Sequence, residues 1–306
     1  MSNFSRVGVL DTSRPADASL SARPAGGLRS VAPEDWDRLL APGNGALSHA
    51  FLAAWEHSEL SGLRSRPVLA FEDGSPEPVA ACPGYFYDLD VVGTRLPAAG
   101  RPLTAVRRLW PRLLTIKAYE LGSPTPLTNP FLVSETLPRE QGVMALVEAA
   151  MAEADRARAR FVLIQNLTSL SGPAPQMLLP FGFAGVPIFP TAVVDLPYSS
   201  FDEYLGAMRA QYRRRANQTF RRSKDLKAEH LRDFGHLADE LAQQWRLIYD
   251  RAKEVRREIL TPSFFRAASD IEDTSVLLLR RPDGSIASFG LLLDDHPWLS
   301  FLQCGF

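Results

Sequence analysis

The same order of predicted elements occurs twice along this 306-residue chain. Each copy begins with two helices, continues with a hairpin whose turn contains Asp and Gly, and ends in one more apolar strand. The hairpins are expected at residues 67–90 and 275–294, with turns at Asp73-Gly74 and Asp283-Gly284. A repeat of this length indicates a duplicated domain. We therefore expect two lobes with related folds.

The remaining elements indicate an α/β fold with a mixed sheet. In the first half a helix over 143–160 leads directly into an apolar strand over 161–167, a step that usually places a strand inside a sheet. The predicted domains are residues 28–198 and 199–306, and residues 1–27, rich in Ser, Ala, Arg and Pro, are expected to form a disordered tail. We expect the second lobe to be incomplete, because no residues follow Phe306 to form its next helix.

Positive charge is concentrated in residues 201–227, which we expect to form one amphipathic helix. At 100° per residue its apolar side chains share one stripe and its cations cover the opposite side. Between Arg209 and Lys227 there are eight Lys or Arg and one acid, a local charge of +7 in a chain whose total is −1. Two interpretations stay open, a solvated helix face and a binding surface for a polyanion.

The composition excludes several classes of protein. A hydrophobic content of 45% and a charged content of 23% are ordinary for a globular protein and exclude a fibre or a disordered chain. Cys82 and Cys304 lie in separate apolar runs without metal-ligand spacing, which predicts buried free thiols, a reducing compartment and no metal site. Neither a signal peptide nor a run of 18 apolar residues is present, so we expect a cytoplasmic protein without a membrane span.

Two motifs add a resemblance to known proteins. The order of elements resembles the GNAT acyltransferase fold, and the tandem arrangement with the Tyr-x-x-x-Met-Arg-x-x-x-Arg-Arg-Arg-x-x-x-x-Phe helix that starts at Tyr204 is similar to FemAB-like acyltransferases. The segment Leu47 to Glu56, Leu-Ser-His-Ala-Phe-Leu-Ala-Ala-Trp-Glu, resembles the opening helix of proteins labelled peptidoglycan biosynthesis or recognition acyltransferases. The similarity covers residues 28–306.

The resemblance implies an N-acyltransferase that moves an acyl group from coenzyme A, or from aminoacyl-tRNA, to an amine, with no permanently bound cofactor. It also implies that amides at a helix start hold the pyrophosphate of coenzyme A. The family pattern there is Arg or Gln, two residues, Gly, one residue, then Gly or Ala; Arg139 and Gly142 match it, whereas Met144 does not. The candidate donor-binding residues are Arg139, Gly142, Arg209, Arg213, Arg214 and Gln303.

Direct attack of an amine on a thioester needs orientation, removal of one proton and a donor near the developing oxyanion. No spacing of Ser, His and Asp, or of Cys and His, indicates a covalent intermediate, so we expect direct transfer. The candidate catalytic residues lie at the ends of predicted helices or strands, where sites are commonly built: His49, Tyr87, Asp88 and Asp294. For each of them a cap, a turn or a surface role is the alternative.

Three functions remain open at this point. The first is an acyl-CoA-dependent N-acyltransferase acting on a small amine or amino acid, and the second is an aminoacyl-tRNA-dependent transferase that forms an amide bond. The third is a non-catalytic protein of the same fold that binds a partner through Arg209 to Lys224. The expected partners are therefore a small amine and, as the alternative, tRNA, but not DNA. Steep salt dependence would distinguish RNA binding from coenzyme A binding.

Overall fold

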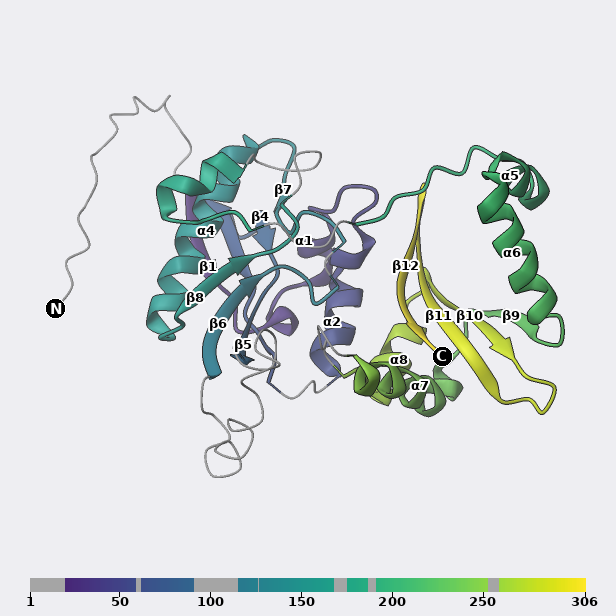
Figure 1. The fold of residues 1–306 in the computed structure, drawn as a ribbon. Helices are drawn as coiled ribbons and strands as arrows, with labels where there is room; N and C mark the ends of the chain where they lie inside the picture. The colour runs from purple at the N-terminus through teal and green to yellow at the C-terminus, as the bar shows by residue number, and fades with distance from the viewer. Residues whose placement is uncertain are drawn as a thin grey trace, which may run out of the picture.

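The computed structural model describes residues 20–58, 62–90, 115–125, 127–167, 175–186, 191–252 and 259–306. The chain forms two lobes that lie side by side (Figure 1). The first lobe runs from purple to teal, and the second runs from green to yellow and ends at β12.

The first lobe is built on two four-stranded sheets. Their strand orders are β1-β3-β4-β7 and β2-β5-β6-β8, and every pairing is antiparallel except that of β6 with β8. The elements are β1 (Leu20–Pro24), η1 (Leu28–Ser30), α1 (Pro33–Asp37), η2 (Gly45–Leu47), α2 (His49–His57), β2 (Arg64–Ser65), β3 (Val68–Glu72), β4 (Pro78–Cys82), β5 (Gly84–Asp90), β6 (Thr115–Leu121), β7 (Leu132–Val133), α4 (Arg139–Arg156), β8 (Phe161–Ile164) and η3 (Pro175–Phe181).

The two sheets are joined where β4 continues into β5. Only Pro83 separates the two strands, and because proline has no N–H it interrupts the hydrogen-bond ladder at this point. Before Pro83 the chain pairs with β3 and β7, and after it the chain pairs with β2 and β6. The bend therefore transfers one long strand from the first sheet to the second.

Alternating side chains of β3 and β4 separate two cores. Val68, Ala70 and Cys82 point to α4, whose buried stripe includes Val143 and Leu146. The residues between them point to the other face, where α1 and α2 pack: Leu69, Ala81 and, on β7, Leu132. This period of two is the one expected for a strand buried on both sides. The first sheet is thus covered by helices on both faces.

The second lobe has one antiparallel sheet in the order β12-β11-β10-β9. One face of the sheet packs on α7 and α8 around a core that includes Leu241, Phe264, Val276 and Leu291. The elements are α5 (Phe201–Ala207), α6 (Ala210–Arg222), β9 (Lys227–Leu231), η4 (Gly235–Leu237), α7 (Ala238–Arg251), α8 (Pro262–Ser269), β10 (Thr274–Arg280), β11 (Ile286–Asp295) and β12 (Trp298–Gly305).

The expected repeat is present in the topology. Strand, helices, hairpin and strand follow one another as β1, α1, α2, β3, β4 with β5, and β6 in the first lobe, and as β9, α7, α8, β10, β11 and β12 in the second. Both hairpin turns place glycine in the left-handed region, Gly74 with φ 79° and Gly284 with φ 85°. The copies differ on the face that α4 covers in the first lobe. In the second lobe that face leaves Leu277 42% and Phe301 60% exposed.

The basic stretch differs from its prediction as one helix. Met208 and Arg209 have extended backbone, with ψ 146° and 144°, so the helix breaks into α5 and α6. The two helices fold back on each other, since the rings of Phe201 and Phe220 lie 5.5 Å apart. Arg213 donates from Nη1 to the carbonyl oxygen of Gly206 at 2.9 Å, which satisfies a carbonyl at the end of α5.

Four shorter segments also differ from what their sequence predicts. Residues 20–24, expected in the tail, form β1 because they pair along β3. The sequence from Leu28 to Val31 predicts a short strand, but residues 28–30 form a 3₁₀ turn. The sequence from Ile188 to Leu196 predicts another strand, but residues 191–196 have no regular structure. The sequence from Arg101 to Ala118 predicts a helical or mixed segment, but strand β6 begins at Thr115, and the earlier part lies outside the described residues. The sequence also predicts helix caps at Ser48 and Thr261, and both are confirmed, since each side chain accepts a helix N–H.

Helix α2 holds the lobes together. Its residues Phe51 and Trp55 are 0% and 5% exposed and belong to the core of the second lobe, where Trp55 lies 4.6 Å from Phe264 between ring centroids. Just before α2, the N–H of Gly45 donates to the carboxylate of Asp295 on β11. The second lobe therefore completes its core with a helix that the first lobe supplies.

We expect Phe51→Ala to destabilise both lobes together by about 3–5 kcal/mol, because it leaves a cavity in the shared core. Urea unfolding would measure the loss, and hydrogen exchange would show β3 and β10 opening faster by the same factor. The control is Phe161→Ala at a 48% exposed position, which should change stability by no more than about 0.5 kcal/mol. Faster exchange in β10 alone would show that α2 does not couple the lobes.

Candidate functional site

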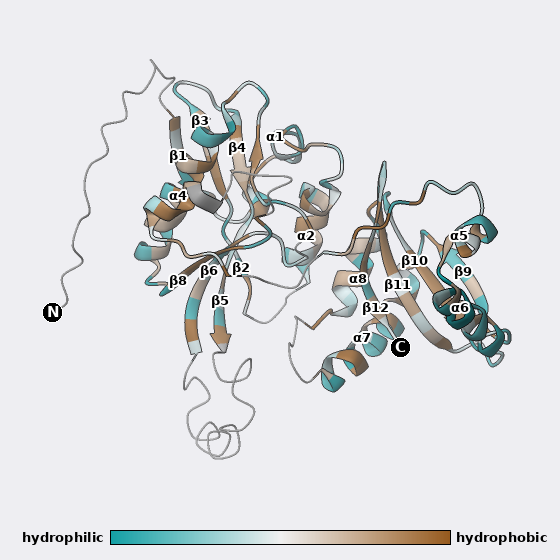
Figure 2. Cartoon of the chain, turned by 45° about the horizontal axis from the view of Figure 1, so that its top comes forward, coloured by the Kyte–Doolittle hydropathy of each residue, from teal (hydrophilic) through white to brown (hydrophobic). Residues whose placement is uncertain are grey.

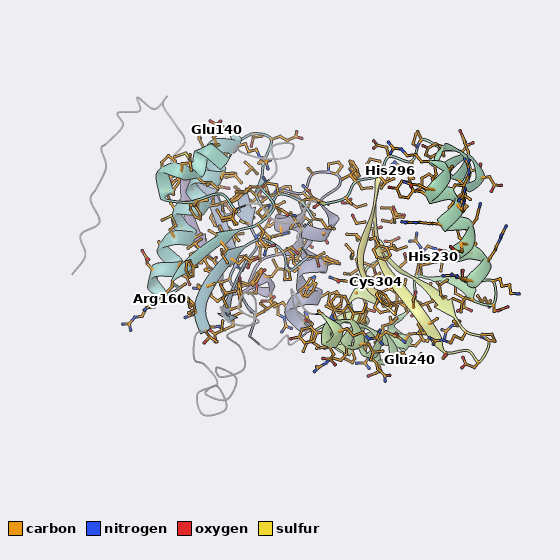
Figure 3. All side chains as sticks on the ribbon, viewed as in Figure 1. Glu140, Arg160, His230, Glu240, His296 and Cys304 are labelled. Carbon is orange, nitrogen blue, oxygen red and sulfur yellow. The ribbon has the colours of Figure 1, made fainter. Side chains whose placement is uncertain are left out.

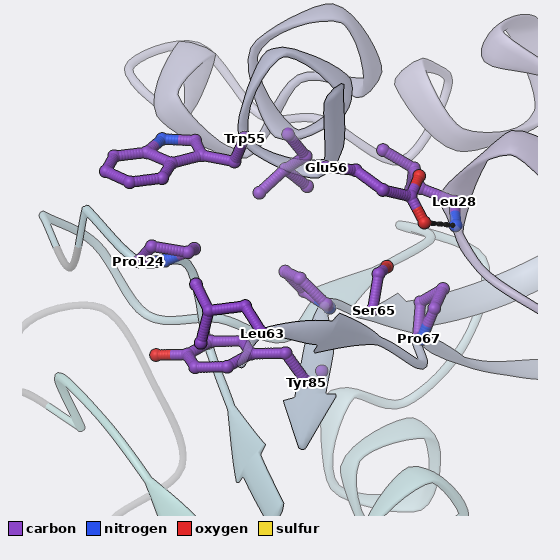
Figure 4. A pocket seen from close by; sticks show the side chains of 12 residues that line it. Leu28, Trp55, Glu56, Leu63, Ser65, Pro67, Tyr85 and Pro124 are labelled. Atoms are coloured by element: carbon purple, nitrogen blue, oxygen red, sulfur yellow. Dashed lines mark hydrogen bonds between the residues drawn. The ribbon is translucent and has the colours of Figure 1, made fainter. Parts of the chain in front are cut away.

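A pocket opens in the first lobe between α2 and the bend from β4 to β5 (Figure 4). The volume of the pocket is about 570 Å³, and part of this volume is open to solvent. Trp55 and Glu56 of α2 form one side, and the ring of Tyr85 lies on the opposite side with Leu63 and Pro124. The other lining residues are Leu28, Leu52, Ser65, Pro67, Pro83, Gly84 and Gly122.

Two of the lining glycines are required by the backbone. A Cβ on Gly84 would lie 2.7 Å from the hydroxyl oxygen of Tyr119 and 2.8 Å from the carbonyl oxygen of Arg66, so no larger residue fits. Gly122 has φ 150°, a conformation that side chains rarely adopt. Because neither glycine carries a side chain, the bend between β4 and β5 and the segment that follows β6 can approach each other closely at the pocket.

A buried carboxylate stands next to the pocket. Glu120 on β6 is 2% exposed and lies opposite Tyr85 of β5 in the strand register. The hydroxyl of Tyr85, itself 7% exposed, donates to Oε1 of Glu120 at 2.8 Å. A carboxylate is a chemical group that can accept a proton, and the hydrogen bond from Tyr85 fixes the position of this one.

Tyr85 and Glu120 are not among the site residues predicted from the sequence. The available signal was the acid itself, because Glu120 interrupts the otherwise apolar run from Ala118 to Leu121. The strand that carries it begins inside the segment 101–118, which the sequence predicts as helical or mixed. An acid inside a central strand is rarely buried without a purpose or a partner.

The opposite end of the pocket is polar. Glu56 accepts hydrogen bonds from the backbone N–H of Leu28 and of Arg29, each at 3.3 Å, and Ser65 lies across from it (Figure 4). Among the described residues that line the pocket, Glu56 is the acid and none is Lys, Arg or His. The lining therefore carries a negative charge that favours a cationic ligand.

Further polar groups follow the carboxyl ends of the parallel pair β6 and β8, a common place for ligand sites in parallel sheets. Thr125 and Asn129 are each 3% exposed, and Thr128 and Asn166 are half-buried. Within the described part of the chain, the hydroxyls of both threonines and the amide nitrogens of both asparagines have no hydrogen-bond partner. Leaving such atoms unpaired costs about 1–3 kcal/mol each, so a ligand or ordered water is expected to satisfy them.

His49, a predicted catalytic residue, is held by structural contacts. Its Nε2 lies 3.2 Å from the carbonyl oxygen of Leu28 and 3.1 Å from that of Val31, so this nitrogen carries the proton. The backbone N–H of His49 donates to Asp37 at 2.7 Å. These contacts tie the start of α2 to the preceding turn.

The other predicted catalytic residues lie on two strands. Tyr87 and Asp88 follow Tyr85 on β5; the rings of Tyr85 and Tyr87 are 5.7 Å apart, and exposed Asp88 pairs with Lys117 in the register. Asp294 is exposed near the end of β11 in the second lobe. Tyr87 and Asp88 therefore lie on β5, the strand that contributes Tyr85 to the pocket, whereas Asp294 lies in the second lobe.

Arg139 and Gly142 lie in the first turn of α4, which begins at Arg139 rather than at 143 as predicted, and the following contacts hold them within the fold. Arg139 donates to the carbonyl oxygen of Phe131 at 3.3 Å, and partial burial lowers the pKa of its guanidinium. The N–H groups of Gln141 and Gly142 both bond to the carbonyl oxygen of Pro138. Gly142 is buried against β7, where a Cβ would lie 2.9 Å from Cγ1 of Val133.

The predicted donor-binding residues lie in three separate places. Arg139 and Gly142 belong to α4, whereas Arg209, Arg213 and Arg214 belong to the α5–α6 hairpin on the far side of the second lobe (Figure 1). Gln303 is 5% exposed on β12. Figure 3 shows how far Glu140, in the first turn of α4, lies from His230 on β9, beside α6. A single donor molecule cannot contact all three groups in this arrangement.

No protein-family model matches this chain. Two curated proteins from strains of Mycobacterium tuberculosis, both named putative 8-amino-7-oxononanoate synthase 2, are 27% identical to it over 250 residues. The match covers 80% of this chain and 32% of each relative. The chain thus spans about a third of the length of the curated relatives it matches.

The chain is also similar to solved acyltransferase structures. FemX matches over 82% of this chain and 73% of its own, with 13% identity and a TM-score of 0.49. Saccharomyces cerevisiae N-myristoyltransferase with bound myristoyl-CoA matches over 96% and 64%, with 12% identity and a TM-score of 0.43.

The packing of Gly142 leads to a prediction. We expect Gly142→Ala to destabilise the protein by about 1–3 kcal/mol, because the new methyl group overpacks Val133 and Leu137. The matched control is Gly206→Ala on α5, where a Cβ meets nothing within 4 Å and the substitution should be neutral or slightly stabilising. Thermal unfolding would compare the two. If Gly142→Ala keeps its stability but loses coenzyme A binding, Gly142 serves the donor rather than the packing.

Proposed function

We propose that this chain is an N-acyltransferase that holds an amine acceptor in the pocket beside α2 and transfers to it an acyl group from acyl-CoA. The observation that carries this proposal is the buried pair of Tyr85 and Glu120 next to the pocket. A carboxylate held by a tyrosine hydroxyl is a suitable proton acceptor for an attacking amine. The resemblance of the element order to GNAT acyltransferases, and the repeat in the topology, support the same reaction class.

In the proposed reaction the amine nitrogen attacks the thioester carbonyl, a C–N bond forms and the C–S bond breaks. Glu120 takes the proton that the nitrogen loses, and that proton then passes to the thiolate of coenzyme A, which leaves as the thiol. Tyr85 positions the carboxylate through its hydrogen bond. No covalent enzyme intermediate is needed, which agrees with the direct transfer expected from the sequence.

For the donor we retain the start of α4 as the candidate site. Arg139 would contact the phosphates from the first turn, where a helix N-terminus favours an anion. Tyr87 and Asp88, on the same strand as Tyr85, remain candidates for orienting the reacting groups. His49 and Asp294 remain only as predictions, and we place the protein in the cytoplasm on the sequence argument. Among the described residues, no helix has the length and apolarity to cross a bilayer.

A second function is favoured by α6. Arg214, Arg215, Arg221 and Arg222 are all exposed on α6, and α6 is the most hydrophilic helix in view in Figure 2. In the described part of the chain, no carboxylate forms an ion pair with them. Such a face suits the phosphates of an RNA, as an aminoacyl-tRNA donor would require.

We expect Glu120→Gln to lower kcat for acyl transfer by about 10²- to 10⁴-fold, because the amide keeps the hydrogen bond from Tyr85 but cannot take the proton. A continuous assay of released coenzyme A thiol, with acetyl-CoA and a panel of amines, would measure it. The control is Glu148→Gln at an exposed position of α4, which should keep full activity. Equal rates for Glu120→Gln and the unchanged chain would remove Glu120 from the mechanism.

Thermal protection would separate the two donors. We expect acetyl-CoA to raise the melting temperature of the chain with little dependence on salt, because a small ligand makes few phosphate contacts. If aminoacyl-tRNA is the donor, it will protect instead, and its affinity will fall steeply with salt. In that case the double variant Arg214→Gln and Arg215→Gln should reduce the slope of log affinity against log salt by about one to two. An unchanged slope would remove α6 from RNA binding.

A further inference from the structure

We infer that the acceptor is a bifunctional amine, with a cationic group bound by Glu56 at one end of the pocket and the reacting amine at the end beside Tyr85 and Glu120. This inference rests on the proposed function, because it names the substrate class of the same pocket. The chemical class is a diamine, or an amine with another cationic group, joined by a short hydrocarbon spacer.

The first support is the charge of the lining. Glu56 is half-buried, and its carboxylate is fixed by the backbone N–H groups of Leu28 and Arg29 at 3.3 Å each. Those two contacts leave acceptor positions unused, since a carboxylate can accept about four hydrogen bonds. With no basic residue among the described lining residues, this carboxylate lacks a cation inside the pocket. An ammonium group of the ligand would supply one.

The second support is the apolar middle of the pocket. Trp55 and Tyr85 present aromatic rings from opposite sides, and Leu63 and Pro124 lie with them (Figure 4). Trp55 is 5% exposed and is held in place by Phe264, so its ring is a rigid wall. Such walls bind methylene groups and, through their faces, also attract a nearby cation. A polar or branched spacer would lose this contact.

The third support is that the two ends of the pocket differ. Glu56 and Ser65 lie together at one end, whereas the Tyr85 hydroxyl points to the other end (Figure 4). There it donates to the buried carboxylate of Glu120, which lies next to the pocket rather than in its lining. Glu56 keeps its ligand group protonated, because a nearby carboxylate favours the ammonium form. The amine at the Glu120 end has to lose its proton before it reacts. A ligand with two amino groups matches both requirements, whereas a monoamine matches one.

The test compares ligands in the unchanged full chain without any acyl donor. Isothermal titration calorimetry would measure binding of a homologous series of α,ω-diamines, and of amino alcohols and ω-amino acids of the same lengths. We expect one diamine to bind about tenfold or more tightly than the matching amino alcohol, and the amino acid to bind weakest because its carboxylate meets Glu56. An amino alcohol or amino acid that binds as tightly as the diamine would overturn the inference.

Variants then assign the cationic end. Glu56→Gln should remove the preference for the diamine over the amino alcohol, whereas Glu56→Asp, which keeps the charge, should retain part of it. Glu148→Gln is the matched control and should bind like the unchanged chain. If Glu56→Gln does not fold, the salt dependence of diamine binding in the unchanged chain replaces it: a preference that does not weaken with salt would contradict a charge contact.

The two proposals fail in different ways. If the diamine binds but receives neither an acetyl group from acetyl-CoA nor an aminoacyl group from aminoacyl-tRNA, the proposed transferase function is wrong while the ligand class stands. If simple monoamines are acylated as efficiently as any diamine, with the same KM, the function stands and the bifunctional acceptor is wrong. Glu120→Gln should bind the diamine normally and lose transfer, which separates binding from chemistry in one variant.

Discussion

The packing of α2 between the two lobes is the interaction on which this structure depends. One side of the helix carries Phe51 and Trp55 into the core of the second lobe, and Leu52 packs in the first. The same helix places Trp55 and Glu56 along the pocket. Because one short helix serves both cores and the pocket, the relative position of the lobes and the shape of the pocket are coupled. A site built on such rigid elements is held more precisely than one built on loops.

The two copies of the repeat have diverged in chemistry. In the first, β6 pairs in parallel with β8, α4 covers the free face of the sheet, and β6 carries the buried acid Glu120. In the second, β12 has no acid between Trp298 and Phe306, and its buried polar residue is Gln303. An amide cannot accept the proton of an attacking amine, so the base of the proposed reaction belongs to the first lobe. The second lobe contributes rigidity and the cationic hairpin.

Much of the fold could be predicted from local spacing. The repeat, the Asp-Gly turns and the caps Ser48 and Thr261 all depend on neighbours in the sequence, and all are present. The helix predicted over 143–160 is also present, with its bounds shifted to Arg139–Arg156. The break at Met208 and Arg209 was missed because the periodicity of residues 201–227 continues across it. Strand β1 was missed because its composition is that of a tail, and only pairing with β3 makes it a strand.

The candidate site shows the same division more sharply. Local pattern was sufficient for the element order, the cationic character of α6 and the resemblance to acyltransferases, since each of these depends on residues close together in the chain. The pocket depends on contacts between residues far apart: Tyr85 meets Glu120 across 35 positions, and Glu56 meets Leu28 across 28. Spacing along a chain carries no information about such pairs, because strand register and the bend at Pro83 place them together. Glu120 and Glu56 were therefore found only once the sheets and α2 were assembled.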